Sequence, residues 1–66
     1  MQVTLNGVPA DLEQTATVAS LVAMHGGEHR RVAVAVNGQV VPRSRWETTG
    51  LATGDSIEVL VPTAGG

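Results

Sequence analysis

The sequence predicts a single α+β domain in which one helix lies across one face of a β-sheet. Three observations predict this class. Two Asn-Gly dipeptides each follow a short segment of alternating hydrophobicity, as in a β-hairpin. Between them, apolar residues recur at helical spacing. A chain of 66 residues also has room for only one hydrophobic core, and strands gathered around one helix are typical of an α+β layer.

The first predicted element is a β-hairpin. Residues 2–5 alternate polar and apolar side chains, and Asn6-Gly7 readily adopts the positive φ angles of a two-residue hairpin turn. The returning segment, residues 8–12, contains Pro9, which cannot donate a hydrogen bond to a strand ladder. We therefore expect the second strand at an edge of the sheet.

A helix is predicted next, because the spacing of apolar residues changes after the hairpin. The stripe at i, i+3, i+4 and i+7 consists of Val18, Leu21, Val22 and His25. Thr17 is the expected N-cap, since its hydroxyl can accept from an unpaired amide of the first turn. Gly26-Gly27 is expected to end the helix, because glycine adopts the left-handed conformation at little cost.

The clearest strand is predicted at residues 31–37, where valines alternate with alanines. The valines are expected on one face of this strand and the alanines on the other. Asn37-Gly38 predicts a second hairpin turn, followed by a short return segment at residues 39–42.

The last third of the chain is predicted to hold a polar connection, residues 43–50, and a final strand, residues 56–61, after a Gly54-Asp55 turn. The connection carries the only aromatic residue, Trp46. We expect Trp46 to cover the open end of the core, with its indole N–H directed to backbone or water.

These elements follow the order ββαββ, and the first and last strands are predicted to lie side by side beneath the helix. This arrangement is the β-grasp fold, with a mixed sheet of four to five strands. Residues 1–61 form the predicted domain, and residues 62–66 form a flexible C-terminal tail. The predicted core consists of Val3, Leu5, Val18, Leu21, Val22, Val32, Val34, Val36, Ile57 and Val59.

Composition excludes several classes of function. The chain has four arginines, no lysine and six acidic residues, for a formal net charge of −2, so no face for nucleic acid is expected. The absence of cysteine excludes disulfides, thiolate metal sites and a cysteine nucleophile. The longest apolar run, residues 32–36, is far too short to span a membrane, and no signal sequence begins the chain. We expect a cytoplasmic protein that contacts no membrane.

The titratable residues predict neither a metal site nor an independent enzyme. His25 and His29, with Glu28 between them, are spaced as zinc ligands would be on a continuous helix, but Gly26-Gly27 interrupts that helix. The acidic residues include no pair spaced for acid–base catalysis, and the serines and histidines form no framework for a triad. We therefore expect no catalytic residue and no bound metal.

The tail, residues 62–66, has neither periodicity nor bulk to pack. Five extended residues reach roughly 16 Å, and two glycines without side chains let the backbone enter a narrow channel. Such a tail would deliver a carboxylate into another protein's cleft. A frayed chain end of small residues would look the same, so the dipeptide alone leaves both interpretations open.

The whole chain resembles a known family in several short motifs. They are Asn6-Gly7, the block Val-Ala-Val-Ala-Val-Asn-Gly-Gln-Val-Val-Pro-Arg at residues 32–43, Trp46, Leu51, Gly54-Asp55, Ile57 and Ala64-Gly65-Gly66. On these residues the chain resembles the thiamine-biosynthesis sulfur carrier family, small ubiquitin-like β-grasp proteins.

The resemblance implies a cycle of activation and sulfur transfer at the C-terminus. A ubiquitin-activator-like adenylating enzyme, using ATP and Mg²⁺, would convert the Gly66 carboxylate to an acyl-adenylate. Sulfur transfer would then give a terminal thiocarboxylate, from which thiazole synthase would take the sulfur. Gly65 and Ala64 would enter the partner's active site. The chain itself would bind no cofactor, and we expect it to be a monomer when free.

A docking face is predicted on the side of the sheet opposite the helix. It consists of Thr4, Ala33, Ala35, Glu58 and Leu60. An ordinary solvated sheet face is the alternative interpretation, since antiparallel sheets tolerate one.

Two other functions fit the same residues. The small subunit of molybdopterin synthase has the same fold and the same tail chemistry. A non-catalytic β-grasp interaction module with an inert terminus is the second alternative.

Overall fold

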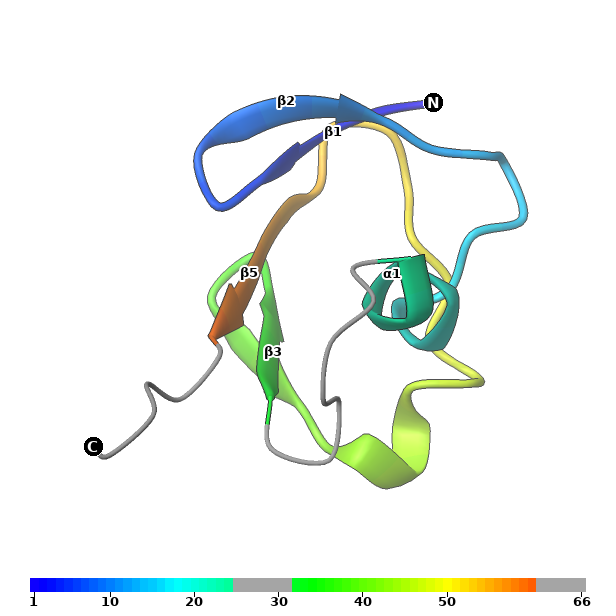
Figure 1. Ribbon diagram of the computed structural model, residues 1–66, viewed down its shortest axis with the longest axis vertical. Helices are drawn as coiled ribbons and strands as arrows, with labels where there is room; N and C mark the ends of the chain where they lie inside the picture. The colour runs from blue at the N-terminus through cyan, green and yellow to red at the C-terminus, as the bar shows by residue number, and fades with distance from the viewer. Residues whose placement is uncertain (25–31, 61–66) are drawn as a thin grey trace.

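The computed structural model describes residues 1–24 and 32–60, which form a five-stranded sheet and one α-helix (Figure 1). The elements in chain order are β1 (Gln2–Leu5), β2 (Val8–Asp11), α1 (Val18–Met24), β3 (Ala33–Val36), β4 (Gln39–Val41), the 3₁₀ helix η2 (Arg43–Arg45) and β5 (Ser56–Leu60). Every predicted strand is present, and the predicted α+β class is confirmed. The 3₁₀ helix lies in the segment that was expected to be a plain polar connection.

Both Asn-Gly dipeptides form the predicted hairpin turns. Asn6 and Gly7 have φ angles of 51° and 82°, and Asn37 and Gly38 have φ angles of 52° and 84°. Positive φ at both central residues is the requirement of a type I′ turn, whose twist matches that of the strands it joins. The dipeptides therefore determine the register of both hairpins.

The strand order is β2-β1-β5-β3-β4, with the last strand at the centre of the sheet. β1 and β5 are parallel, with Leu5 opposite Ile57, and β5 is antiparallel to β3, with Ile57 opposite Val36. Figure 1 shows these strands facing α1 from one side. The predicted pairing of first and last strands is confirmed, and β2, which contains Pro9, lies at an edge as expected.

The first backbone N–H groups of α1, which have no acceptor within the helix, all donate to acceptors outside it or to the capping side chain. Thr17 and Ser20 bond reciprocally: Thr17 N–H donates to Ser20 Oγ at 2.9 Å, and Ser20 N–H donates to Thr17 Oγ1 at 3.2 Å. Val18 N–H donates to Thr49 C=O and Ala19 N–H to Trp46 C=O, both at 3.0 Å. The predicted N-cap is confirmed, and the connection after η2 anchors the helix by satisfying its free donors.

The core lies between α1 and the inner face of the sheet. It consists of Val3, Leu12, Val18, Leu21, Val22, Val34, Trp46, Leu51, Ile57 and Val59. Leu12 and Leu51 were not in the predicted core, while Leu5, Val32 and Val36 are partly buried at its margin. Leu12 and Leu51 are isolated apolar residues in connections, where no periodic pattern indicates the direction of a side chain.

Trp46 closes one end of this core, as predicted. The side chain is buried, and its Nε1–H donates to Val41 C=O at 2.9 Å. The Arg43 guanidinium lies over the indole, with Cζ 5.4 Å from the ring centroid. Burial of a large ring with its one polar atom bonded is favourable, so Trp46, the C-cap of the 3₁₀ helix, ties that helix to the packed core.

Four regions for which expectations were stated lie partly or wholly outside the described residues. They are the end of the helix at His25 and Gly26-Gly27, the histidine pair with Glu28, the first residue of the strand expected at 31–37, and the last residue of the strand expected at 56–61 together with the tail at 62–66. Within residues 1–24 and 32–60, no helix has the length and hydrophobicity needed to cross a membrane.

Candidate functional site

The predicted docking face is assembled on the side of the sheet away from α1. Ala33 lies opposite Leu60, and Ala35 lies opposite Glu58, in the antiparallel pairing of β3 with β5. Directly paired side chains project from the same face of a sheet, while the intervening Val34 and Val59 are buried on the other face. The structure therefore places four of the five predicted residues, Ala33, Ala35, Glu58 and Leu60, together on one face.

Leu60 is the main apolar feature of this face. Its side chain is 70% exposed, although it follows the buried Val59 at the end of the central strand. Ala33 and Ala35 beside it are small, so they leave the leucine projecting from a shallow surface. Thr4 extends the same face onto β1, where it lies opposite Ser56.

Val40 belongs to the same face and was not predicted. It is 74% exposed and lies opposite Ala35 on β4. The two-residue turn at Asn37-Gly38 sets this register, because it places Gln39 opposite Val36 and hence Val40 opposite Ala35. Counting residues outward from the turn would have found it. We call the group Ala33, Ala35, Val40, Glu58 and Leu60 the outer face.

Asp55 has the structural role that its position after Gly54 predicted. Its Oδ2 accepts from Ala52 N–H at 2.8 Å, and its Oδ1 accepts from Asn37 Nδ2 at 3.0 Å. Gly54 has a φ of 89°. The carboxylate therefore organises the turn before β5 and links it to the second hairpin.

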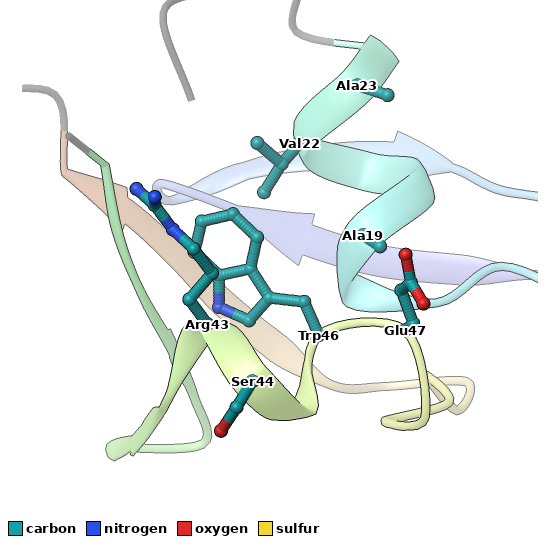
Figure 2. Close-up of a pocket in the computed structure, with 7 residues that line it drawn as sticks. All are labelled: Ala19, Val22, Ala23, Arg43, Ser44, Trp46 and Glu47. Carbon is teal, nitrogen blue, oxygen red and sulfur yellow. The ribbon is translucent and has the colours of Figure 1, made fainter. Parts of the chain in front are cut away.

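A groove of about 460 Å³ lies between α1 and η2 (Figure 2). Its lining residues are Ala19, Val22, Ala23, Arg43, Ser44, Trp46 and Glu47. Figure 2 shows the Trp46 indole between η2 and α1, with Arg43 alongside it. Among these lining residues, one carboxylate and one hydroxyl are the only groups that could accept a proton in catalysis, and they form no nucleophile–base pair.

The part of the chain that the structure describes holds no group of three or more histidine, cysteine or acidic side chains suited to a metal ion. The proposed carrier residues Ala64, Gly65 and Gly66 lie outside the described residues. The structure therefore describes β5, the strand that precedes the tail in the sequence, and the outer face to which β5 contributes Glu58 and Leu60.

A mixed five-stranded sheet in this order, with one helix across one face, defines a ubiquitin-like β-grasp protein. Comparison with known proteins identifies the family. The model of the ThiS family matches residues 3–66, and the chain belongs to that family. This membership confirms the resemblance to the thiamine-biosynthesis sulfur carriers.

Solved structures agree with this assignment. The crystal structure of a thiamine biosynthesis protein (ThiS) from Geobacter metallireducens has a TM-score of 0.83 and 30% sequence identity, and the match covers 100% of both chains. The NMR solution structure of a thiamine biosynthesis protein from the same organism has a TM-score of 0.83 and 29% identity, covering 100% of this chain and 88% of that chain.

A curated relative is much longer than this chain. A thiazole synthase of Paramagnetospirillum magneticum is 30% identical over 66 residues, which are 100% of this chain and 20% of that protein. The chain thus spans a fifth of that relative's length.

Proposed function

We propose that this protein is a sulfur carrier for the assembly of the thiazole ring of thiamine, with Gly66 as the carrying residue. The observation that supports this most strongly is the match of the ThiS family model to residues 3–66, which includes the Gly-Gly terminus. In this proposal the β-grasp domain binds first the adenylating enzyme and then thiazole synthase, and the terminus reacts in each.

The proposed cycle begins with a carboxylate, which is a poor electrophile. The Gly66 carboxylate oxygen attacks the α-phosphorus of ATP, so that pyrophosphate leaves and a mixed anhydride with AMP forms. A sulfur nucleophile at the oxidation level of sulfide then attacks the carbonyl carbon, and AMP leaves with the C–O bond electrons. The product is a thiocarboxylate. No electrons are gained or lost in either step.

The partner enzymes supply the catalytic groups in this proposal. ATP and Mg²⁺ are used by the adenylating enzyme, in which backbone and charged groups stabilise the charge that develops on phosphate. The carrier contributes the reacting carbon and a surface for docking.

Thiazole synthase is the proposed acceptor of the sulfur. The similarity of this chain to a fifth of a thiazole synthase supports this, because carrier-like and synthase sequence then occur in one polypeptide. Covalent linkage of two modules raises their effective concentration. Such a linkage is an advantage when a carrier must bind its synthase in every round of sulfur transfer.

The experiment that tests the function is an intact-protein mass spectrum. The 66-residue chain is incubated with ATP, Mg²⁺, sulfide and the adenylating enzyme of the same organism, and an oxygen-for-sulfur exchange at the terminus is expected. Thiazole synthase should then discharge the thiocarboxylate, whereas the large subunit of molybdopterin synthase should not. An unchanged mass would point to an interaction module with an inert terminus.

Leu60→Glu is expected to weaken capture by the adenylating enzyme. The substitution places a charge on the outer face at the end of the central strand, and burial of an unpaired charge is unfavourable, so we expect KM for the carrier to rise by roughly tenfold or more. Because Leu60 is exposed, the free energy of unfolding should change by only about 0.5 kcal/mol. Steady-state release of pyrophosphate measures KM.

Val8→Glu is the matched control for this change. Val8, like Leu60, is an exposed apolar residue of the sheet, but it lies on the edge strand β2, away from the outer face. The control should leave KM within about twofold. Equal values of KM for the two variants would contradict a docking role for Leu60.

A further inference from the structure

One side chain bonds both backbone groups of Val59. Asn6 Oδ1 accepts from Val59 N–H at 2.9 Å, and Asn6 Nδ2 donates to Val59 C=O at 3.2 Å. The two residues are 53 positions apart in the sequence. Val59 is only 8% exposed, and buried backbone groups of this kind need a partner in the folded protein.

The amide of Asn6 continues the parallel ladder beyond the point where the backbone leaves it. Leu5 lies opposite Ile57, and Asn6 N–H donates to Ile57 C=O at 2.8 Å. In a regular parallel ladder, Val59 N–H would next donate to the backbone carbonyl of Asn6. At a φ of 51° the backbone of Asn6 turns into the hairpin. The side-chain carbonyl takes the place of the backbone carbonyl as the acceptor.

Asn37 bonds both backbone groups of Ser56, at the other end of β5. It occupies the same position in the second hairpin turn, with a φ of 52°. Its N–H donates to Ser56 C=O at 2.7 Å, and its Oδ1 accepts from Ser56 N–H at 2.9 Å. Two hairpin asparagines therefore hold the central strand: Asn37 holds its start, and Asn6 holds its end.

We propose that Asn6 is a positioning residue for the carrier terminus, acting through Val59. This inference rests on the proposed function. Seven residues follow Val59, and the last of them is the proposed sulfur-carrying Gly66. A tail can reach only those points that lie within its own length of the residue from which it starts. By bonding both backbone groups of Val59, Asn6 fixes the place from which the tail starts and hence the region that Gly66 can reach.

Asn6→Gly and Asn37→Gly form a matched pair of variants. Glycine adopts positive φ without strain, so each variant keeps its turn and loses only the side-chain amide. In the full 66-residue chain, with the adenylating enzyme, ATP and sulfide, Asn6→Gly is expected to lower kcat by about tenfold or more, since small displacements of a reacting group have large effects on rate. KM should stay within about twofold, because Leu60 keeps its pairing with Ala33 on the outer face. Asn37→Gly should leave both constants within about twofold.

Amide hydrogen exchange provides a readout independent of activity. The Val59 amide should exchange faster in Asn6→Gly, and the Ser56 amide should exchange faster in Asn37→Gly. Asn6→Asp is a second variant for use if Asn6→Gly does not fold. Its carboxylate can still accept from Val59 N–H but sets an oxygen against Val59 C=O, so kcat should again fall.

Three results would overturn the inference. They are equal kcat for the two glycine variants, a change in KM alone for Asn6→Gly, and unchanged exchange at Val59 in that variant. Thermal unfolding must first show that both variants are folded at the temperature of the assay. If the unsubstituted chain forms no thiocarboxylate, the proposed function fails instead. The exchange comparison then still decides whether Asn6 holds Val59.

Discussion

A chain that lacks Gly66 is expected to form no thiocarboxylate, although it folds as the full chain does. The deletion leaves a carboxylate at Gly65, which reaches roughly 3.5 Å less far than the original. Displacement of a reacting group by even about 1 Å can cost a hundredfold in rate, so activation should fall below detection. Intact-protein mass after incubation with the adenylating enzyme, ATP and sulfide measures the outcome.

Thr63→Ala is the matched control for the deletion, because it alters the same tail without changing its length. This variant should acquire sulfur at nearly the rate of the unsubstituted chain. The unfolding midpoint should be the same for all three proteins, since the described core ends at Val59. Sulfur acquisition by the shortened chain would remove the basis of the carrier function.

Ile57→Ala is expected to remove a large part of the free energy of unfolding. Ile57 is 0% exposed at the centre of β5, between β1 and β3. Removal of a fully buried isoleucine side chain costs about 2–5 kcal/mol. The total free energy of unfolding of a chain this size is about 3–10 kcal/mol. Urea denaturation followed by fluorescence of Trp46, the single tryptophan, measures the change.

Leu60→Ala is the control on the same strand. Because Leu60 projects from the opposite face and is exposed, its truncation should alter the free energy of unfolding by only about 0.5 kcal/mol. A loss as large as that of Ile57→Ala would mean that the outer face is covered in the folded protein. The comparison thus tests which face of β5 the core occupies.

Local sequence patterns predicted most of the fold. The Asn-Gly dipeptides predicted both hairpins, because few other residue pairs accept positive φ at two successive positions. The alternation of valine and alanine in β3 predicted the face on which each side chain lies, because successive residues of a strand point to opposite faces, although only Val34 of the predicted valines is fully buried. Thr17 predicted the start of α1, which its hydroxyl caps.

Connections were predicted less well, since they lack a repeating pattern. Leu12 and Leu51 each stand alone between elements, and only the assembled core shows that they are buried. The hydrogen bonds from the Val18 and Ala19 amides reach carbonyls in the segment after η2, far along the chain from α1. These bonds, and the 3₁₀ helix itself, depend on contacts between distant segments. No local signal encodes such pairings.

The candidate site shows the same division. The alternation in β3 and β5 predicted the faces on which Ala35, Glu58 and Leu60 lie, and their opposition in the sheet is confirmed. Val40 was missed, although the register of its hairpin places it beside Ala35. Whether this surface docks a partner stays a prediction, which the Leu60 and Val8 variants test.

The amino-acid sequence by itself determined the secondary structure, the turns and the family, because each is written in neighbouring residues or in short motifs. Only the tertiary structure decided that Asn6 and Asn37 hold the two ends of β5. The physical reason is that a side-chain amide bonds whichever backbone the fold brings within reach. For Asn6, that backbone lies 53 residues further along the chain.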